Sequence, residues 1–254
     1  MLKVTFLGTG TSQGVPVIAC NCEACRSIDE RDKRLRTSVL IENENTTVII
    51  DTGPDFRQQM LRENVKKLDA VLYTHEHRDH IAGLDDIRAF NFVNQQPMDI
   101  YSEARVTNAL KYEFPYIFDG RKYPGIPRLN MHEISDKEFT VNSLKIIPVR
   151  VMHYRLPILG FRIGELSYIT DADFIAEEEK EKLIGSKYLV INALRKEKHI
   201  SHFCLEQALD LVREISPKKA FLIHLSHQMG LQAKLQEELP ANVIVAYDGL
   251  KVEF

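Results

Sequence analysis

Three histidines and an aspartate gather in the segment YTHEHRDHIAG, residues 73–83, directly after an apolar run. Neutral imidazole nitrogens and carboxylate oxygens are ligands for zinc, manganese or iron. Along an extended chain alternate side chains share one face, so His75 and His77 can meet one ion. A turn in the middle of the segment would direct Asp79 and His80 towards a second ion. The spacing therefore predicts two adjacent metal ions.

Three further candidate ligands follow strand-like runs in the second half of the chain. His153 follows KIIPVRVM, Asp171 follows YIT and His224 follows AFLI. Strand ends from distant chain segments can converge on one rigid rim. We therefore expect these residues to join the histidine loop.

Strand-like runs and amphipathic helices alternate along the chain in two blocks. We expect strands at residues 4–7, 38–41, 46–50, 70–73, 144–151, 159–163, 168–169, 188–191, 220–224 and 242–247. Helices are expected at 56–65 and 202–215, and in the second the apolar stripe consists of Leu205, Ala208, Leu209, Val212 and Ile215. Two such blocks predict two sheets packed face to face with helices outside.

The composition is typical of a globular protein: 254 residues, 44% hydrophobic and 27% charged. No linker or repeat divides the chain, so we expect one domain over residues 1–254. The formal net charge of -3 provides no global attraction for nucleic acid, which makes a nucleic-acid partner unlikely. The first residues are too short for a signal peptide and no apolar run approaches a membrane span, so we expect a cytoplasmic protein with no membrane partner.

Residues 90–130 differ from the rest because aromatic residues occur there among prolines. The aromatic residues are Phe90, Phe92, Tyr112, Phe114, Tyr116, Phe118 and Tyr123. The region could be an insertion that covers the substrate, and the alternative is ordinary packing of the aromatic rings.

The order HEHRDH matches the H-x-H-x-D-H signature of the metallo-β-lactamase superfamily of binuclear hydrolases, and the chain resembles that superfamily over nearly its whole length. FLGTGTSQGVP, DTGPD, MHY, ITDAD and LIHLSH stand in the family's order. The match is closest to the phosphodiesterase branch, particularly the cyclic-phosphate phosphodiesterase of the carbon-phosphorus lyase pathway, and more distantly to ribonuclease Z. The resemblance implies an α/β fold, an αββα sandwich of two mixed sheets with helices outside.

The resemblance also implies the roles of single residues. Two divalent ions, zinc or manganese, would be held by His75, His77 and His153 and by Asp79, His80 and His224, with Asp171 reaching both. Asp51, after another strand-like run, would orient a ligand, with capping of the next helix as the alternative. His202 would be the general acid, and we count Asp79 with it among the catalytic residues. His199 would then bind substrate or be structural.

Three of the four cysteines, Cys20, Cys22 and Cys25, lie in CNCEAC. In a reducing compartment this spacing suggests metal more than disulfide, but three thiolates are one short of a closed zinc site. The phosphodiesterase branch has a structural zinc that a histidine completes, which here implies His227. The alternative is three reduced cysteines packed as small apolar groups. Cys204 is expected to be a core or helix-start residue.

Two cations bridged by a carboxylate can share a solvent oxygen and lower its pKa, so that a bridging hydroxide can attack phosphorus. We expect a binuclear phosphodiesterase acting on small phosphate esters, cyclic ones among the candidates. The alternatives are a lactonase or thioesterase and a non-catalytic metal-binding protein of the same fold. A ribonuclease is less attractive because we find no basic arm rich in glycine and proline. A homodimer is plausible by analogy.

The segment GTGTSQG could be mistaken for a phosphate-binding loop, but it lacks the P-loop lysine. Its glycines Gly8, Gly10 and Gly14 are expected to let the backbone turn close to the metal rim. Three arginines could steer an anionic substrate, although solvated surface charge is the favoured interpretation of each. These arginines are Arg36, Arg155 and Arg195.

Overall fold

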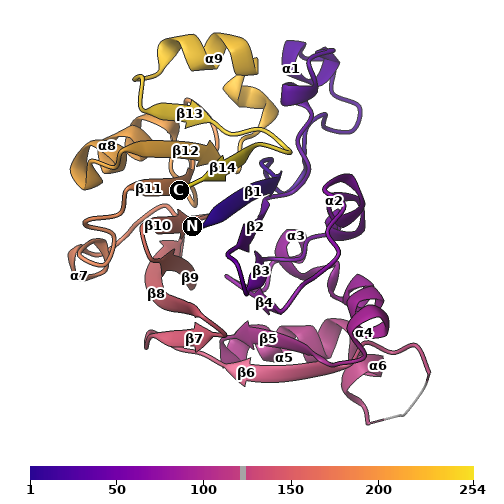
Figure 1. The fold of residues 1–254 in the computed structure, drawn as a ribbon. Coiled ribbons are helices and arrows are strands. Elements are labelled where there is room, and N and C mark those ends of the chain that lie inside the picture. Colours follow the sequence, from indigo (N-terminus) through magenta and orange to yellow (C-terminus); the bar gives the residue numbers. More distant parts are fainter. Residues whose placement is uncertain (121–123) are drawn as a thin grey trace.

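The computed structural model describes residues 1–120 and 124–254, which fold into two facing sheets with helices on their outer sides (Figure 1). The first sheet contains β1 (Lys3–Gly8), β2 (Ser38–Glu42), β3 (Thr47–Ile50), β4 (Ala70–Leu72), β5 (Met98–Ser102), β6 (Leu129–Glu133) and β14 (Lys251–Glu253), in the order β14-β1-β2-β3-β4-β5-β6. The second contains β7 (Phe139–Val141), β8 (Leu144–His153), β9 (Leu156–Ile163), β10 (Leu166–Ile169), β11 (Tyr188–Asn192), β12 (Lys219–Ile223) and β13 (Val243–Val245), in the order β13-β12-β11-β10-β9-β8-β7.

The helices of the described residues are short. They are α1 (Glu23–Arg26), α2 (Phe56–Arg62), α3 (Arg78–Ile81), α4 (Arg88–Asn94), α5 (Ala104–Glu113), α6 (Pro115–Phe118), α7 (Glu177–Lys180), α8 (Leu205–Ile215) and α9 (Gln232–Glu238), with 3-10 turns η1 (Glu30–Asp32), η2 (Leu84–Ile87) and η3 (His227–Met229). None of the helices in this described part is long and apolar enough to span a membrane.

Both sheets are mixed, as predicted. Strands β3 to β6 run parallel to one another, and so do β10 to β13, whereas the remaining neighbours are antiparallel. Parallel strands end at the same edge of a sheet, and crevices at that edge are the usual binding sites of α/β proteins. Parallel pairing therefore brings together the residues after β3 and β4 in the first sheet and those after β10 and β12 in the second, and the facing of the two sheets lets both sets meet.

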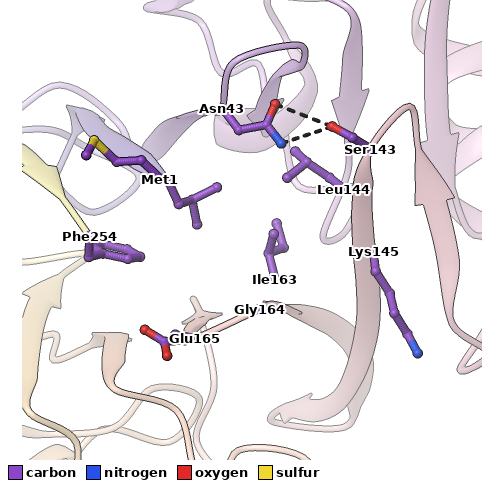
Figure 2. A pocket seen from close by; sticks show the side chains of 10 residues that line it. Met1, Asn43, Ser143, Leu144, Lys145, Ile163, Gly164, Glu165 and Phe254 are labelled. Carbon is purple, nitrogen blue, oxygen red and sulfur yellow. Dashed lines mark hydrogen bonds between the residues drawn. The ribbon is translucent and has the colours of Figure 1, made fainter.

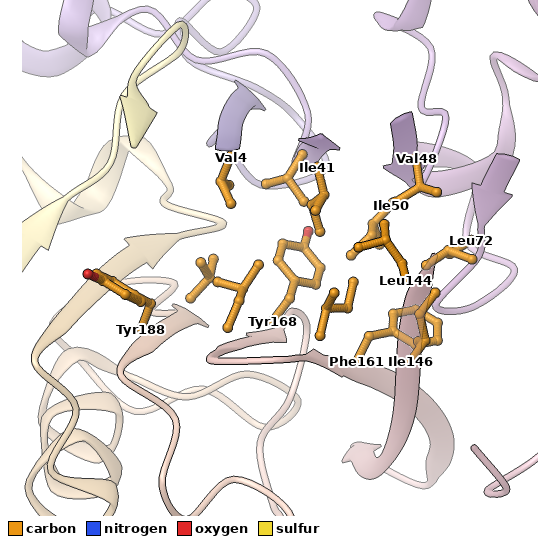
Figure 3. Close-up of a cluster of buried hydrophobic side chains, with 14 of the residues drawn as sticks. Val4, Ile41, Val48, Ile50, Leu72, Leu144, Ile146, Phe161, Tyr168 and Tyr188 are labelled. Atoms are coloured by element: carbon orange, nitrogen blue, oxygen red, sulfur yellow. The ribbon is translucent and has the colours of Figure 1, made fainter. Parts of the chain in front are cut away.

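Alternate residues of each strand enter different cores. In β2, Val39 and Ile41 pack between the two sheets, whereas Leu40 packs against the helices outside. Val190 and Leu189 of β11 divide in the same way. Figure 3 shows the core between the sheets, with side chains from both sheets pointing towards one another. Strands buried on both faces read as continuous apolar runs, which is why the sequence pattern located them.

The helices close two further cores on the outer faces. Helices α2 and α5 pack on the first sheet through residues such as Phe56 and Leu110. Helix α8 packs on the second through Ala208, Val212 and Ile215, and Leu211 adds to the predicted stripe. The predicted αββα sandwich of the α/β class is confirmed.

The region 90–130 is partly sheet. Residues 98–102 and 129–133 form β5 and β6 of the first sheet, so these stretches are part of the fold and not an insertion on it. Among the aromatic residues of this region Phe90 is buried, as ordinary packing predicts, whereas Phe92, Tyr112 and Tyr116 are exposed. Tyr123 lies outside the described residues. Substrate covering by the rest of the region stays a prediction.

Candidate active site

The strand ends bring the candidate ligands to one rim. His153 is the last residue of β8, Asp171 follows β10 and His224 directly follows β12. His75 comes shortly after β4, and His77 stands at the start of α3. Residues far apart in the sequence therefore meet because strands of both sheets end on the same side of the sandwich.

The first group consists of His75, His77 and His153. One ring nitrogen from each of the three lies within 4.8 Å of the other two. The ring centroids of His77 and His153 are 5.0 Å apart, and those of His75 and His77 are 4.7 Å apart. The structure thus brings together the three histidines predicted for one ion.

The second group is centred on Asp171. Its Oδ2 lies 3.3 Å from Nε2 of His80 and 3.2 Å from Nδ1 of His224. Asp79 joins Asp171 and His224 with ligand atoms within 4.8 Å, and Asp171 also meets His75 within that distance. Asp171 therefore lies between the two groups, where the sequence analysis expects it.

The protonation states of three histidines suit metal binding. Burial lowers the pKa of His75 well below its usual range, lowers that of His77, and lowers that of His224 to about 4. These imidazoles are neutral at pH 7, and the neutral ring offers a lone pair to a metal ion. Moreover, Nε2 of His75 and Nδ1 of His224 are buried without a hydrogen-bond partner in the described residues. Such atoms are rare in native proteins, and a cation would satisfy them.

The pKa of His80 is affected by the negative charge of the neighbouring carboxylates. Burial opposes a charge on its ring, yet Asp79, Asp171 and Asp51 together raise its pKa well above the usual value. Buried carboxylates are costly unless a cation compensates them. The donor set, the neutral rings and this charge together fit divalent metal ions.

Asp51 holds one of the candidate ligands. Its Oδ2 accepts a hydrogen bond from Nδ1 of His80 at 2.7 Å, so that Nε2 of His80 faces the cluster. The backbone and hydroxyl of Thr74 also donate to Asp51, at 2.9 and 2.8 Å. The capping alternative is wrong, because the residue at the N-terminus of α2 is Asp55.

Thr74 is a residue that the sequence analysis missed. While its hydroxyl donates to Asp51, its oxygen lies 2.9 Å from Nδ1 of His75 and can accept from it. This contact leaves Nε2 of His75 free for the rim. A threonine beside a histidine has no distinctive pattern, so only the structure identifies the contact.

The predicted acid, His202, lies against the cluster. Its Nε2 is 3.1 Å from Oδ1 of Asp171, and its Nδ1 is 3.0 Å from the hydroxyl of Ser201 and 3.3 Å from Nδ1 of His199. Because His153, Asp171 and His202 also present ligand atoms within 4.8 Å, His202 is close enough to reach an ion. Its role as the general acid stays a prediction.

Four residues at these strand ends share an unusual backbone conformation. Asp51, Asp171, His224 and Tyr154 have φ of 64°, 58°, 54° and 57°. Each directly or closely follows a strand, namely β3, β10, β12 or β8. Positive φ is uncommon outside glycine, and it persists at functional sites where the surroundings impose it. Nothing in the sequence pattern indicated Tyr154.

An ion-pair network ties the histidine loop to the second sheet. Glu76, between two candidate ligands, pairs with Arg105 of α5. Arg105 also donates to the carbonyl oxygen of Pro157 in β9 at 2.6 Å. Glu103, just before α5, pairs with Arg150 of β8 at 2.7 Å. Part of the region 90–130 thus supports the loop, which the sequence analysis did not foresee.

The three clustered cysteines form a second, separate group with His227. Nδ1 of His227 lies 3.2 Å from Sγ of Cys20 and 3.3 Å from Sγ of Cys22, and all four ligand atoms lie within 4.8 Å. A hydrogen bond from the backbone of Cys25 lowers the pKa of Cys22 to about 6, whereas burial raises the pKa of Cys25 to about 11. Three sulfurs and one imidazole are a donor set for tetrahedral zinc. Cys204 is buried at the start of α8, as predicted.

The glycine segment lies beside this rim. Gly10 forms β-bridges with Arg36 and with Leu225, the neighbour of His224. A Cβ at Gly8 would lie 1.9 Å from the carbonyl oxygen of Arg36, so only glycine fits there. Arg36 itself is held by Asp55 at 3.0 Å, and this partner accounts for its charge.

Two surface pockets differ in their relation to the rim. One, of about 460 Å³, is lined by His77, His153, Tyr154, Arg155, Leu156, Ile200 and Ser201. Another, of about 430 Å³, lies near both chain ends and is lined by Met1, Phe254 and neighbouring residues (Figure 2). The second pocket contains none of the predicted site residues, so only the first opens beside the metal ligands.

A family model described as the beta-lactamase superfamily domain matches residues 46–225. The chain belongs to this superfamily. The predicted resemblance is therefore confirmed at the level of the metallo-β-lactamase superfamily, whose members are metal-dependent hydrolases. The superfamily fold implies divalent metal ions, and the clusters of histidine and aspartate fit them.

Relatives within the superfamily have different names. An octanoyltransferase of Porphyromonas gingivalis is 44% identical over 253 residues, 98% of this chain and 51% of that protein. A ribonuclease Z of Nostoc sp. is 25% identical over 65% of this chain and 47% of that protein. The chain thus spans about half the length of these curated relatives.

Solved structures resemble the chain more fully. A crystal structure described as a new diphosphatase from the PhnP family superposes with a TM-score of 0.94 and 37% identity, over 100% of this chain and 98% of that one. Zn(2+)-bound PqqB from Methylobacterium extorquens has a TM-score of 0.79 and 17% identity, over 99% of this chain and 100% of that one, and shows the fold alone.

Proposed function

We propose that the protein is a binuclear metal-dependent phosphodiesterase acting on small phosphate esters, with cyclic esters among the candidates. The observation that carries the proposal is the position of Asp171, whose carboxylate lies between the group of His75, His77 and His153 and the group around His224. A carboxylate shared by two groups of imidazoles suits a pair of adjacent cations.

The candidate ligands form two sets, one for each metal ion. His75, His77 and His153 would hold one ion, and Asp79, His80 and His224 the other, with Asp171 reaching both. Two divalent ions held there would activate water and neutralise the charge on phosphate oxygens.

The other polar residues around the ligands position groups and move protons. Asp51 and Thr74 hold His80 and His75 in the orientation that points Nε2 to the rim. His202, 3.1 Å from Asp171, would hold a proton at Nε2 and give it to the leaving oxygen. The carboxylate of Asp79 lies at the same rim and would be close to the phosphate group that reacts.

The four donors Cys20, Cys22, Cys25 and His227 would hold a structural zinc. This ion would tie the N-terminal loop to η3, three residues beyond His224. The described contacts between His227 and two sulfurs, at 3.2 and 3.3 Å, support this arrangement.

Reaction at phosphorus is favoured by the similarity to the structure described as a diphosphatase, at 37% identity over the full chain. Hydrolysis of a diphosphate is therefore the second candidate, and it would use the same residues. The octanoyltransferase matches this chain over only 51% of its own length, so its name gives weaker support for acyl chemistry. A lactonase or thioesterase and a non-catalytic metal-binding protein are the remaining alternatives.

A substrate panel tests the proposal. Purified protein should hydrolyse bis-p-nitrophenyl phosphate, lose this activity to a chelator, and leave lactones and thioesters intact. Preference for thioesters or lactones would contradict the proposal. Absence of turnover with metals bound would favour the non-catalytic alternative. A diphosphate ester in the same panel decides between the two phosphorus substrates.

A further inference from the structure

The pocket beside the first histidine group has a distinct chemical character. Of about 460 Å³, it is lined by two candidate metal ligands, His77 and His153, and by aromatic, apolar and cationic side chains. No carboxylate is among these lining residues. By contrast, a pocket of about 260 Å³ nearby along the chain is lined by four acidic residues, Asp173, Glu177, Asp210 and Glu214. Of these two pockets, the first is therefore the one suited to an anionic group.

The backbone holds Tyr154 in a constrained conformation in the lining of this pocket. It follows His153 directly, has φ of 57°, and its amide donates to Oδ1 of Asp173 at 2.6 Å. A bulky aromatic residue rarely adopts this conformation, which here occurs also at Asp51 and Asp171. Nevertheless Tyr154 is 48% exposed, so burial of its ring does not account for the positive φ.

Arg155 is a cation without a carboxylate partner. In the described residues it makes no ion pair or hydrogen bond, and its guanidinium carbon lies 5.1 Å from the centroid of the Tyr154 ring. Arg36 and Arg195, the other two arginines considered as steering groups, are both occupied by partners. Arg155 therefore keeps its charge available two residues from His153.

Ile200 adds an apolar surface to the same pocket. It is 68% exposed, and it precedes Ser201, whose carbonyl oxygen lies 2.7 Å from Nδ1 of His153. A flat aromatic group can stack on an exposed tyrosine and contact an isoleucine, while a guanidinium pairs with an anionic substituent. Tyr154 and Ile200 thus suit a planar ring, and Arg155 suits an anionic group attached to that ring.

We propose that this pocket binds the organic substituent of the phosphate ester, and that the substituent is a planar ring carrying a second anionic group. The ring stacks on Tyr154 and contacts Ile200, and Arg155 pairs with the anion. The proposal rests on the proposed function for the phosphate end of the ligand, which lies at the metal rim.

Binding of three phosphate monoesters to the metal-loaded protein tests the proposal by calorimetry, without need of turnover. The probes are methyl phosphate, phenyl phosphate and 4-carboxyphenyl phosphate. Phenyl phosphate should bind about 5-fold more tightly than methyl phosphate, because of one aromatic stacking contact. 4-Carboxyphenyl phosphate should bind about 10-fold more tightly than phenyl phosphate, because of a charge-assisted hydrogen bond.

Three variants separate the contribution of the ring from that of the carboxylate. Tyr154→Ala should abolish the preference for phenyl over methyl phosphate, and Tyr154→Phe should keep it. Arg155→Gln should abolish the preference for the carboxylated ring. Inorganic phosphate should bind with equal affinity to the wild type and to each variant, because the metal ligands are unchanged. The matched controls Tyr112→Ala and Arg213→Gln remove an exposed tyrosine and an exposed arginine that do not line the pocket.

Equal affinity of the wild-type protein for the three esters, binding of none of them, or preferences that survive Tyr154→Ala and Arg155→Gln would overturn the proposal. Hydrolysis of bis-p-nitrophenyl phosphate is measured separately. If the protein hydrolyses the diester but binds phenyl and methyl phosphate equally, only the proposed role of the pocket is refuted. If it prefers phenyl phosphate but does not hydrolyse the diester, only the proposed function is refuted.

Discussion

The two candidate metal centres are assembled from different parts of the fold. The histidine and aspartate cluster takes its ligands from the ends of several strands, and His75, Asp171 and His224 are at most 2% exposed. The cysteine group takes three ligands from one loop, residues 20–25, and one from η3, and Cys20, Cys22 and His227 are only half-buried. Sheets support the first group of ligands, whereas only the single-turn helix α1 and the 3-10 turn η3 support the cysteine group.

This difference predicts opposite consequences of losing a ligand. A substitution at the sheet edges should abolish chemistry while the three cores keep the fold intact. A substitution in the cysteine loop should lower the stability of the fold. It should affect the rate of hydrolysis only indirectly, through the segment that joins His227 to His224. Four substitutions test this difference.

Asp171→Ala should have the largest effect, a loss of phosphodiester hydrolysis to the background rate. The carboxylate between the two histidine groups would be gone, so neither ion would keep its position. The thermal unfolding midpoint should remain near that of the wild type, and a kinetic assay with calorimetry checks both. Asp210→Asn, an exposed aspartate on α8, is the control and should keep full activity. Activity of Asp171→Ala within tenfold of wild type would refute the central role of this residue.

His202→Ala should lower the rate by about 100- to 10,000-fold, as loss of a general acid does. Both ions should remain bound, because the other ligands are unchanged. Elemental analysis beside the kinetic assay separates this role from ligation, since loss of one ion would show that His202 is a ligand. His132→Ala removes an exposed histidine paired with Asp99 and should change neither quantity.

Asp51→Asn should weaken metal affinity or activity by about 10- to 100-fold. The amide cannot replace the carboxylate that accepts from Nδ1 of His80 and from both groups of Thr74. Metal titration against a competing chelator measures the change. Unchanged affinity would mean that packing alone orients His80.

Cys22→Ser should have the smallest effect on chemistry and a measurable effect on stability. It should remove one zinc per chain and lower Tm by about 4–8 °C, equivalent to about 2 kcal/mol for a domain of this size. Hydrolysis should fall less than tenfold. Cys204→Ser is the control, because serine is a good residue at a helix start and should retain the zinc. Full zinc content in Cys22→Ser would rule out the proposed cysteine site.

Much of the sandwich was predictable because its strands are buried on both faces. The apolar runs at β2, β4 and β11 are continuous, and the amphipathic stripe of α8 is strong. By contrast β6, with the sequence LNMHE, is half-exposed and polar, and β14 has only three residues. Such edge strands are defined by their neighbours, so no local pattern identifies them.

The same limit applies at the candidate site. His75, His77 and His80 are recognisable from their spacing, and His153 and His224 from their place after apolar runs. The convergence of these residues depends on strand order and parallel pairing, which the sequence pattern does not specify. Contacts such as Thr74 with His75, and the pairing of Arg105 with Glu76, join ordinary residue types across the fold and leave no local signal.

Anomalous diffraction from crystals of the metal-loaded protein tests the binuclear site, because it locates each ion and identifies its element. We expect two ions at one rim, the first among His75, His77 and His153, the second beside His80 and His224, with Asp171 contacting both. A single ion at this rim, or ions bound elsewhere with Asp171 uninvolved, would contradict this expectation.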